Sequence, residues 1–234
     1  MKTEQQQLKH INNECQTNYT SLNDVDWRYI TINQKLSEPF IREFADKLNW
    51  DLISECQTLS ENLIRDFSDK VNWYYISEHQ KISENLIRDF KDVVDWRYIT
   101  IKQKLSEPFI REFADKIVWF YASEYQQLSE PLIREFKDEV EWYYISEYQR
   151  LSESFIREFK DRIYWRWISQ FQTLSENFIR EFADKLDWRR ISEHQKLSEP
   201  FIREMKNRVY WWRISTHQNI SESFRKEFQK RIKK

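Results

Sequence analysis

Tryptophan recurs at a constant interval of 23 residues along this chain, and no other feature constrains the fold as strongly. A fixed period of about 20–50 residues is typical of proteins that stack one small structural unit many times. Aligned on the tryptophan, the units read W-x-Y-I-S-E-x-Q-K-L-S-E-P-F-I-R-E-F-x-D-K-Φ-D, where Φ is aliphatic, and positions are numbered from the tryptophan. The recurring tryptophans, assigned a structural role, are Trp27, Trp50, Trp73, Trp96, Trp119, Trp142, Trp165, Trp188 and Trp211.

Each unit predicts two short helices. The first begins at the tryptophan, and Trp27, Ile30 and Gln34 form its inner stripe with the i, i+3, i+7 spacing of one helix face. The second begins after an N-cap serine such as Ser37, followed by a glutamate that favours the positive end of the helix dipole. Helices of about ten residues are too short to persist alone, so neighbouring units must bury each other's apolar faces.

The chain contains no glycine, which disfavours hairpin turns and nucleotide-binding loops that need positive φ angles. Leucine-rich repeats would need an L-x-L strand motif, and a coiled coil would need heptads. Neither pattern recurs. We therefore predict an all-α solenoid of nine 23-residue helix-turn-helix repeats over residues 27–233. Residues 1–26 form a degenerate N-terminal cap with a shortened unit around residues 10–17, and the last unit, residues 211–234, forms a polar, basic C-terminal cap.

A glutamine occupies position eight of every unit, on the inner stripe of the predicted first helix. A buried amide needs hydrogen-bond partners, so these side chains are expected to bind backbone groups at the turn between helices or to form a ladder along the stack. A row of ligand-binding amides is the other interpretation. The glutamines are Gln34, Gln57, Gln80, Gln103, Gln126, Gln149, Gln172, Gln195 and Gln218.

Nothing in the sequence predicts a catalytic, cofactor-binding or metal site. The carboxylates of the second helix have cationic neighbours four residues away, as in Glu38–Arg42, Arg42–Asp46 and Glu43–Lys47, which indicates a solvated face rather than acid–base chemistry. His79, His194 and His217 recur at position seven without a recurrent third ligand. Cys15 and Cys56 suggest neither a disulfide framework nor a nucleophile. We expect that the protein is not an enzyme.

Variable positions of the first helix are the best candidates for a binding surface. Positions two, six and nine, which are Arg28, Ile32 and Lys35 in the first unit, change from unit to unit while the core positions do not. In the middle units, positions three and seven add aromatic rings, which either pack between adjacent repeats or contribute to an exposed aromatic patch with arginines. The candidate partner-binding residues are Phe120, Tyr121, Tyr125, Tyr143, Tyr144, Tyr148, Arg166, Trp167, Phe171, Arg189 and Arg190, and Tyr164 extends the same patch.

The recurring phrases W-R-Y-I-T-I-K-Q-K-L-S-E-P-F-I-R-E-F-A-D-K and W-Y-Y-I-S-E-Y-Q-R-L-S-E-S-F-I-R-E-F resemble repeats in uncharacterised proteins of large DNA viruses of amoebae, the mimivirus-like group. The resemblance covers residues 27–233. It brings no catalytic residues with it, and it implies a viral protein that acts inside an infected cell or is packaged in the particle.

Three functions fit these features. The first is a non-enzymatic scaffold that binds a protein partner through the first-helix face. The second is a single-stranded nucleic-acid binder that uses the Tyr, Trp and Arg columns and the basic segment 203–234. The third is a self-assembling virion or structural component. A net charge of −1 provides no general attraction to nucleic acid, and the absence of a signal peptide or membrane-spanning run predicts an intracellular protein without membrane contact.

Overall fold

A computed structural model describes residues 2–232, and over this range the chain is helical and contains no strand. It opens with α1 (Glu4–Cys15) and a 3₁₀ turn, η1 (Leu22–Asp24). Each unit then contributes a first helix of seven residues that begins at its tryptophan and a second helix of six residues that begins at the glutamate after the N-cap serine. The first helices are α2 (Trp27–Asn33), α4 (Trp50–Cys56), α6 (Trp73–His79), α8 (Trp96–Lys102), α10 (Trp119–Tyr125), α12 (Trp142–Tyr148), α14 (Trp165–Phe171), α16 (Trp188–His194) and α18 (Trp211–His217). The second helices are α3 (Glu38–Glu43), α5 (Glu61–Asp66), α7 (Glu84–Asp89), α9 (Glu107–Glu112), α11 (Glu130–Glu135), α13 (Glu153–Glu158), α15 (Glu176–Glu181), α17 (Glu199–Glu204) and α19 (Glu222–Glu227), and α20 (Gln229–Ile232) follows the last of them.

The all-helical repeat architecture predicted from the tryptophan period is therefore confirmed. The helices are shorter than the predicted ten or so residues. The first helix ends where the position-eight glutamine takes an extended conformation, as at Gln57 with φ −99° and ψ 154°. The second ends near the position-eighteen phenylalanine, as at Phe67, after which a run of turns leads to the next tryptophan.

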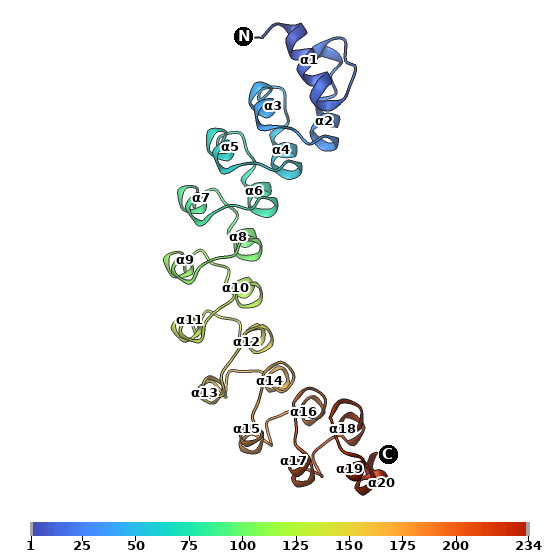
Figure 1. The fold of residues 1–234 in the computed structure, drawn as a ribbon. Helices are drawn as coiled ribbons and strands as arrows, with labels where there is room; N and C mark the ends of the chain where they lie inside the picture. The colour runs from blue at the N-terminus through green and yellow to red at the C-terminus, as the bar shows by residue number, and fades with distance from the viewer. Residues whose placement is uncertain (1, 233–234) are drawn as a thin grey trace. The chain divides into compact units, whose positions relative to one another are not determined.

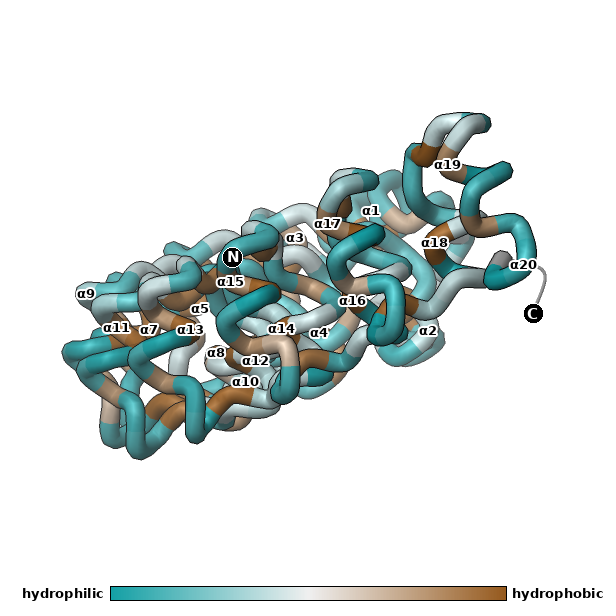
Figure 2. The backbone as a smooth tube through the Cα atoms, turned by 90° about the horizontal axis from the view of Figure 1, so that it is seen from below, coloured by the Kyte–Doolittle hydropathy of each residue, from teal (hydrophilic) through white to brown (hydrophobic). Residues whose placement is uncertain are grey.

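The chain forms two compact units, Met1–Val118 and Trp119–Lys234, so the division falls between two repeats. Within each unit the first helices of successive repeats pack directly on one another, α4 on α6 in one and α12 on α14 in the other. The second helices of each unit form a row of their own beside these first helices (Figure 1). Hydrophobic and hydrophilic segments alternate along the backbone (Figure 2), as expected for short amphipathic helices joined by polar turns.

Aliphatic side chains from both helices of each repeat build the core. Ile53 at position four and Leu63 and Ile64 at positions fourteen and fifteen are completely buried. The tryptophan joins neighbouring repeats at this core. The Trp50 ring lies 4.7 Å from Phe67 of its own repeat, and its Nε1 donates a hydrogen bond of 2.8 Å to the Ala45 carbonyl of the preceding one.

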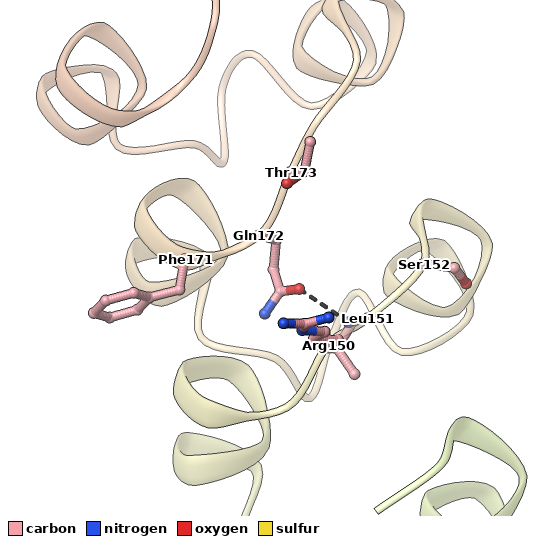
Figure 3. A pocket seen from close by; sticks show the side chains of 6 residues that line it. All are labelled: Arg150, Leu151, Ser152, Phe171, Gln172 and Thr173. Atoms are coloured by element: carbon pink, nitrogen blue, oxygen red, sulfur yellow. Dashed lines mark hydrogen bonds between the residues drawn. The ribbon is translucent and has the colours of Figure 1, made fainter. Parts of the chain in front are cut away.

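The glutamine amides bridge successive repeats. Gln172 Oε1 accepts a hydrogen bond of 2.9 Å from the Leu151 N–H (Figure 3). Its Nε2 donates to the carbonyls of Gln149 at 2.8 Å and Ser146 at 3.3 Å. All three groups belong to the turn between the helices of the preceding repeat, or to the end of its first helix. One side chain thus satisfies backbone groups that neither short helix can satisfy, because helix ends leave donors and acceptors unpaired.

A buried hydroxyl at position five makes a second bridge that the sequence pattern did not reveal. Ser54 is completely buried, and its Oγ donates to the Trp50 carbonyl at 2.7 Å. The same Oγ accepts a hydrogen bond of 2.9 Å from the N–H of Asn72, which caps the next first helix. Serine or threonine at this position therefore fixes where the following repeat begins.

Ion pairs on the second helices run both within and between repeats. The predicted pairing of positions twelve and sixteen occurs in later repeats, as in Glu130–Arg134 at 3.6 Å, but in the first repeat the predicted partners meet other residues. Arg42 pairs with Asp66 of the next repeat at 2.7 Å, and Asp46 pairs with Lys70 at 2.6 Å. Glu38 instead accepts a hydrogen bond of 3.1 Å from the Ser60 N–H. The i, i+4 rule requires a continuous helix, whereas α3 ends at Glu43, before either Asp46 or Lys47.

Helix α1 covers the N-terminal end of the first unit. Its Ile11 and Cys15 are buried, and Glu14 accepts hydrogen bonds from the N–H of Ser37 at 2.6 Å and its hydroxyl at 3.0 Å. Within the repeats, the glutamate after the cap serine makes the same contacts to the next repeat. The predicted shortened unit around residues 10–17 thus lies largely within one 12-residue helix that substitutes for a second helix.

At the other end, Arg225 replaces the core isoleucine of the repeat and is exposed, while neighbouring Phe224 is completely buried. The last two residues of the predicted C-terminal cap, 233–234, lie outside the described residues. Within residues 2–232, no helix combines the length and apolar character that crossing a bilayer would require.

Removal of one bridging amide tests the role of the glutamines. In Gln149→Ala, the Leu128 N–H and the Ser123 and Gln126 carbonyls lose partners at 2.8–3.0 Å. We expect a loss of about 2–3 kcal/mol in the free energy of unfolding, because buried backbone groups are left without hydrogen bonds. Urea unfolding followed by circular dichroism measures it. Gln127, an exposed glutamine of the preceding repeat, provides the control, and Gln127→Ala should leave the unfolding midpoint unchanged.

The two cysteines should differ in reactivity towards a thiol reagent. Both are unpaired thiols, and burial raises the pKa of both, that of Cys15 to about 11, but Cys15 is buried and Cys56 is exposed. Since the thiolate is the reactive form, we expect one equivalent of thiol to react in the native protein and the second only in denaturant. A Cys56→Ser variant should abolish the native phase, and its persistence would contradict the placement of Cys15 in the core.

Candidate functional site

Aromatic side chains of α10 and α12 form a connected row on the first-helix face. The Tyr121 and Tyr125 rings lie 6.3 Å apart on α10, and Phe120 lies 5.2 Å from Tyr121. Phe120 also makes an edge-to-face contact of 4.9 Å with Tyr144 of the next repeat. Edge-to-face pairs at such distances are a favourable arrangement of aromatic rings.

The row continues into α14. Tyr144 lies 6.0 Å from Tyr148 and 5.2 Å from Tyr143, which contacts Trp167 of the next repeat at 5.6 Å. Trp167 lies 5.8 Å from Phe171. These rings, with Tyr164 at 5.4 Å from Tyr143, form what we call the aromatic cluster: Phe120, Tyr121, Tyr125, Tyr143, Tyr144, Tyr148, Tyr164, Trp167 and Phe171.

Stacking of repeats brings these residues together because position two of one repeat meets position three of the next. The rule applies to Phe120–Tyr144 and Tyr143–Trp167. It applies equally in the other unit, where Tyr74 and Tyr98 lie 5.1 Å apart and their hydroxyls are joined by a hydrogen bond of 2.8 Å. Any aromatic residues at these two positions in adjacent repeats will therefore touch.

The aromatic positions divide by exposure. Position-three rings such as Tyr144 are half-buried between repeats. This placement fits the first of the two predicted alternatives, packing between adjacent repeats. Position-seven rings are open to solvent, with Tyr125 and Tyr148 each 52% exposed and Phe171 47% exposed. A contiguous set of large exposed rings is unusual on a monomeric surface and is typical of interaction sites.

The three candidate arginines do not share one location. The Arg166 guanidinium lies over the Trp167 ring at 5.2 Å, at the edge of the aromatic cluster. Arg190 is half-buried at position three of its repeat, and Arg189 lines a separate hollow of about 520 Å³ with Tyr210 and Trp212. Among residues 2–232, neither Arg189 nor Arg190 makes a ring contact with the cluster.

Three carboxylates within the aromatic cluster were not among the candidate residues. Glu141 and Glu147 lie one helical turn on either side of Tyr144, and Glu124 comes from the preceding repeat. Burial raises the pKa of Tyr144, and the charges of Glu124, Glu141 and Glu147 raise it further, because negative charge disfavours the phenolate. Within residues 2–232, none of the three glutamates forms an ion pair.

A hollow of about 520 Å³ opens beside the cluster between the turns that follow α12 and α14 (Figure 3). Arg150 and Gln172 point towards each other in it, while Phe171 points away. Since the Gln172 amide is already bound to the backbone of the preceding repeat, this hollow belongs to the bridge between repeats.

The histidines form no metal centre in the part of the chain that the structure describes. His194 and His217 each lie 3.8 Å from Glu193, and His79 lies 3.4 Å from Glu78. No group of three or more His, Cys, Asp or Glu side chains within residues 2–232 is arranged to hold an ion.

Comparison with models of known protein families, with curated proteins and with solved structures finds no match. The fold itself defines the class: a protein of short helical repeats.

The acidic surroundings of the exposed tyrosines can be tested by titration. Burial raises the pKa of Tyr148, and the neighbouring Glu147 carboxylate raises it further. In Glu147→Gln that charge is removed, so we expect the Tyr148 phenol to ionise at lower pH than in the parent protein. Nuclear magnetic resonance of ring-labelled tyrosine, assigned through Tyr148→Phe, measures the shift. An unchanged midpoint would contradict the placement of Glu147 beside that ring.

Proposed function

We propose that this protein is a non-enzymatic repeat scaffold that binds a protein partner through the first-helix face, centred on the aromatic cluster. The observation that carries the proposal is the row of exposed position-seven rings, Tyr125, Tyr148 and Phe171, on top of a second layer of half-buried rings. Large aromatic side chains have few rotatable bonds, so they lose little conformational entropy on binding, and they bury much apolar area. Interface hot spots are rich in them for this reason.

The helical scaffold supports this role. Each ring is attached to a seven-residue helix whose two ends are held by hydrogen bonds to neighbouring repeats, through the position-five hydroxyl and the position-eight amide. The ring positions are thus set before a partner arrives, which reduces the entropy lost on association. The resemblance to viral repeat proteins suggests that the partner is met inside an infected cell or in the particle.

Single-stranded nucleic acid is the less favoured ligand for the same rings. Base stacking would suit Tyr148 and Phe171, but a phosphate chain running along them would approach Glu124 and Glu147, which have no cationic partners within residues 2–232. Self-assembly is a further alternative, which light scattering of the purified protein at several concentrations would reveal as a growing particle mass.

The exposed rings provide the direct test. The full chain and the variant Tyr125→Ser, Tyr148→Ser, Phe171→Ser are used to capture partners from host extract treated with nuclease, and affinity for the captured protein is then measured. Removing three hot-spot side chains should weaken binding by about a hundredfold or more. Tyr29→Ser, at a ring that is 50% exposed in the other unit, should bind normally.

Two results would contradict the proposal. One is capture of the same protein with equal affinity by the triple variant, provided that its circular dichroism matches the parent's. The other is capture that disappears on nuclease treatment, which would favour nucleic acid as the ligand.

A further inference from the structure

We infer that the aromatic cluster recognises a basic segment of its protein partner, with arginine side chains seated between its rings and Glu124, Glu141 and Glu147. This inference rests on the proposed function and specifies the chemistry of the partner. It follows from two independent features of the surface: exposed rings, and carboxylates that the fold leaves without a cation. Together they match a guanidinium, which can stack on a ring and donate to a carboxylate at once.

The protein contains an internal example of this recognition in its last repeats. Arg213, at position three, donates from Nη1 to Glu193 Oε1 at 2.7 Å, and Glu193 is at position six of the preceding repeat. The same guanidinium lies 4.5 Å from the centre of the Trp212 ring at position two. A carboxylate from one repeat and a ring from the next therefore hold an arginine between them.

In the middle repeats the position-six carboxylate is present, but position three contains a ring in place of arginine. Glu124 is at position six, and Tyr143 and Tyr144 are at positions two and three of the repeat that follows. Glu147 stands in the same relation to Trp167. At position three, where the last repeat has Arg213, these repeats have the rings of Tyr144 and Trp167. Since Glu124 and Glu147 form no ion pair within residues 2–232, a guanidinium that pairs with them beside these rings has to come from another molecule.

Carboxylates are paired differently on the two rows of helices. On the second helices, glutamates at position seventeen are paired with arginines of the preceding repeat, as in Arg134–Glu158 and Arg157–Glu181 at 2.8 Å. On the first-helix face, Glu124, Glu141 and Glu147 have no such partner within residues 2–232. Arg166 lies over the Trp167 ring at the edge of the cluster, and Arg150 lines the hollow beside it. The cluster thus presents unbalanced negative charge beside exposed rings.

A synthetic peptide in which arginine alternates with serine, about 15 residues long, provides the probe, and fluorescence anisotropy at low salt measures its binding to the full chain. We expect binding that weakens with salt and is at least about tenfold weaker in Glu124→Gln, Glu141→Gln, Glu147→Gln, since three attractive charges are lost. The same peptide with glutamate in place of arginine should not bind.

The matched control removes the same charge from the opposite row of helices. Glu158→Gln, Glu181→Gln, Glu204→Gln loses three carboxylates from consecutive repeats, each paired with an arginine at 2.8 Å. It should bind the arginine peptide within about twofold of the parent, because only the first-helix face is involved. Equal weakening in both variants would reduce the effect to net charge and overturn the inference, as would a failure of the parent to bind the peptide.

A second measurement separates this inference from the proposed function. Affinity for the captured partner is determined with the Glu124→Gln, Glu141→Gln, Glu147→Gln variant beside the variant that lacks the exposed rings. Loss in both supports a basic partner segment. Loss only when the rings are removed would leave the partner-binding role in place and overturn the basic segment. If neither set of substitutions weakens binding, both proposals fail.

Discussion

The hydrogen bonds of the position-eight glutamine are the interaction on which the rest of this structure depends. Helices of seven and six residues leave most of their end groups without intrahelical partners. Gln172 satisfies three of these groups in the repeat before it, through Leu151, Gln149 and Ser146. Without such a bridge, a unit of 23 residues would have too little core to compensate for its exposed backbone.

The same dependence between repeats creates the candidate site. Position two of one repeat contacts position three of the next, so rings placed at these positions become a connected cluster, as Phe120–Tyr144 and Tyr143–Trp167 do. Where the sequence places arginine at position three instead, as at Arg213, the neighbouring glutamate binds it. A constant scaffold thus presents a surface whose chemistry changes repeat by repeat, aromatic and acidic around Tyr144 and basic around Arg189.

Most of the fold was predictable because residues with the same structural role recur at the same positions in every repeat. Capping serines, the glutamates after them and buried isoleucines such as Ile53 mark the helices directly. The candidate site was predictable in part: the rings were identified, but not the role of Glu124, Glu141 and Glu147. In the sequence these glutamates resemble ordinary surface charges. Only the contacts between repeats show that they have no arginine partner, whereas Glu158 and Glu181 each pair with an arginine of the preceding repeat.

The sequence by itself determined the class of fold, the repeat boundaries and the columns of side chains, since these follow from local spacing and capping. Tertiary structure alone decided which residues meet. Arg42 pairs with Asp66 rather than Asp46, and the Ser54 hydroxyl accepts a hydrogen bond from the N–H of Asn72. Stacking brings residues about one repeat apart into contact. Residues four apart are not brought together where the helix has already ended between them, as α3 does at Glu43. Distances of that kind depend on how one repeat is seated on the next, which no single 23-residue unit contains.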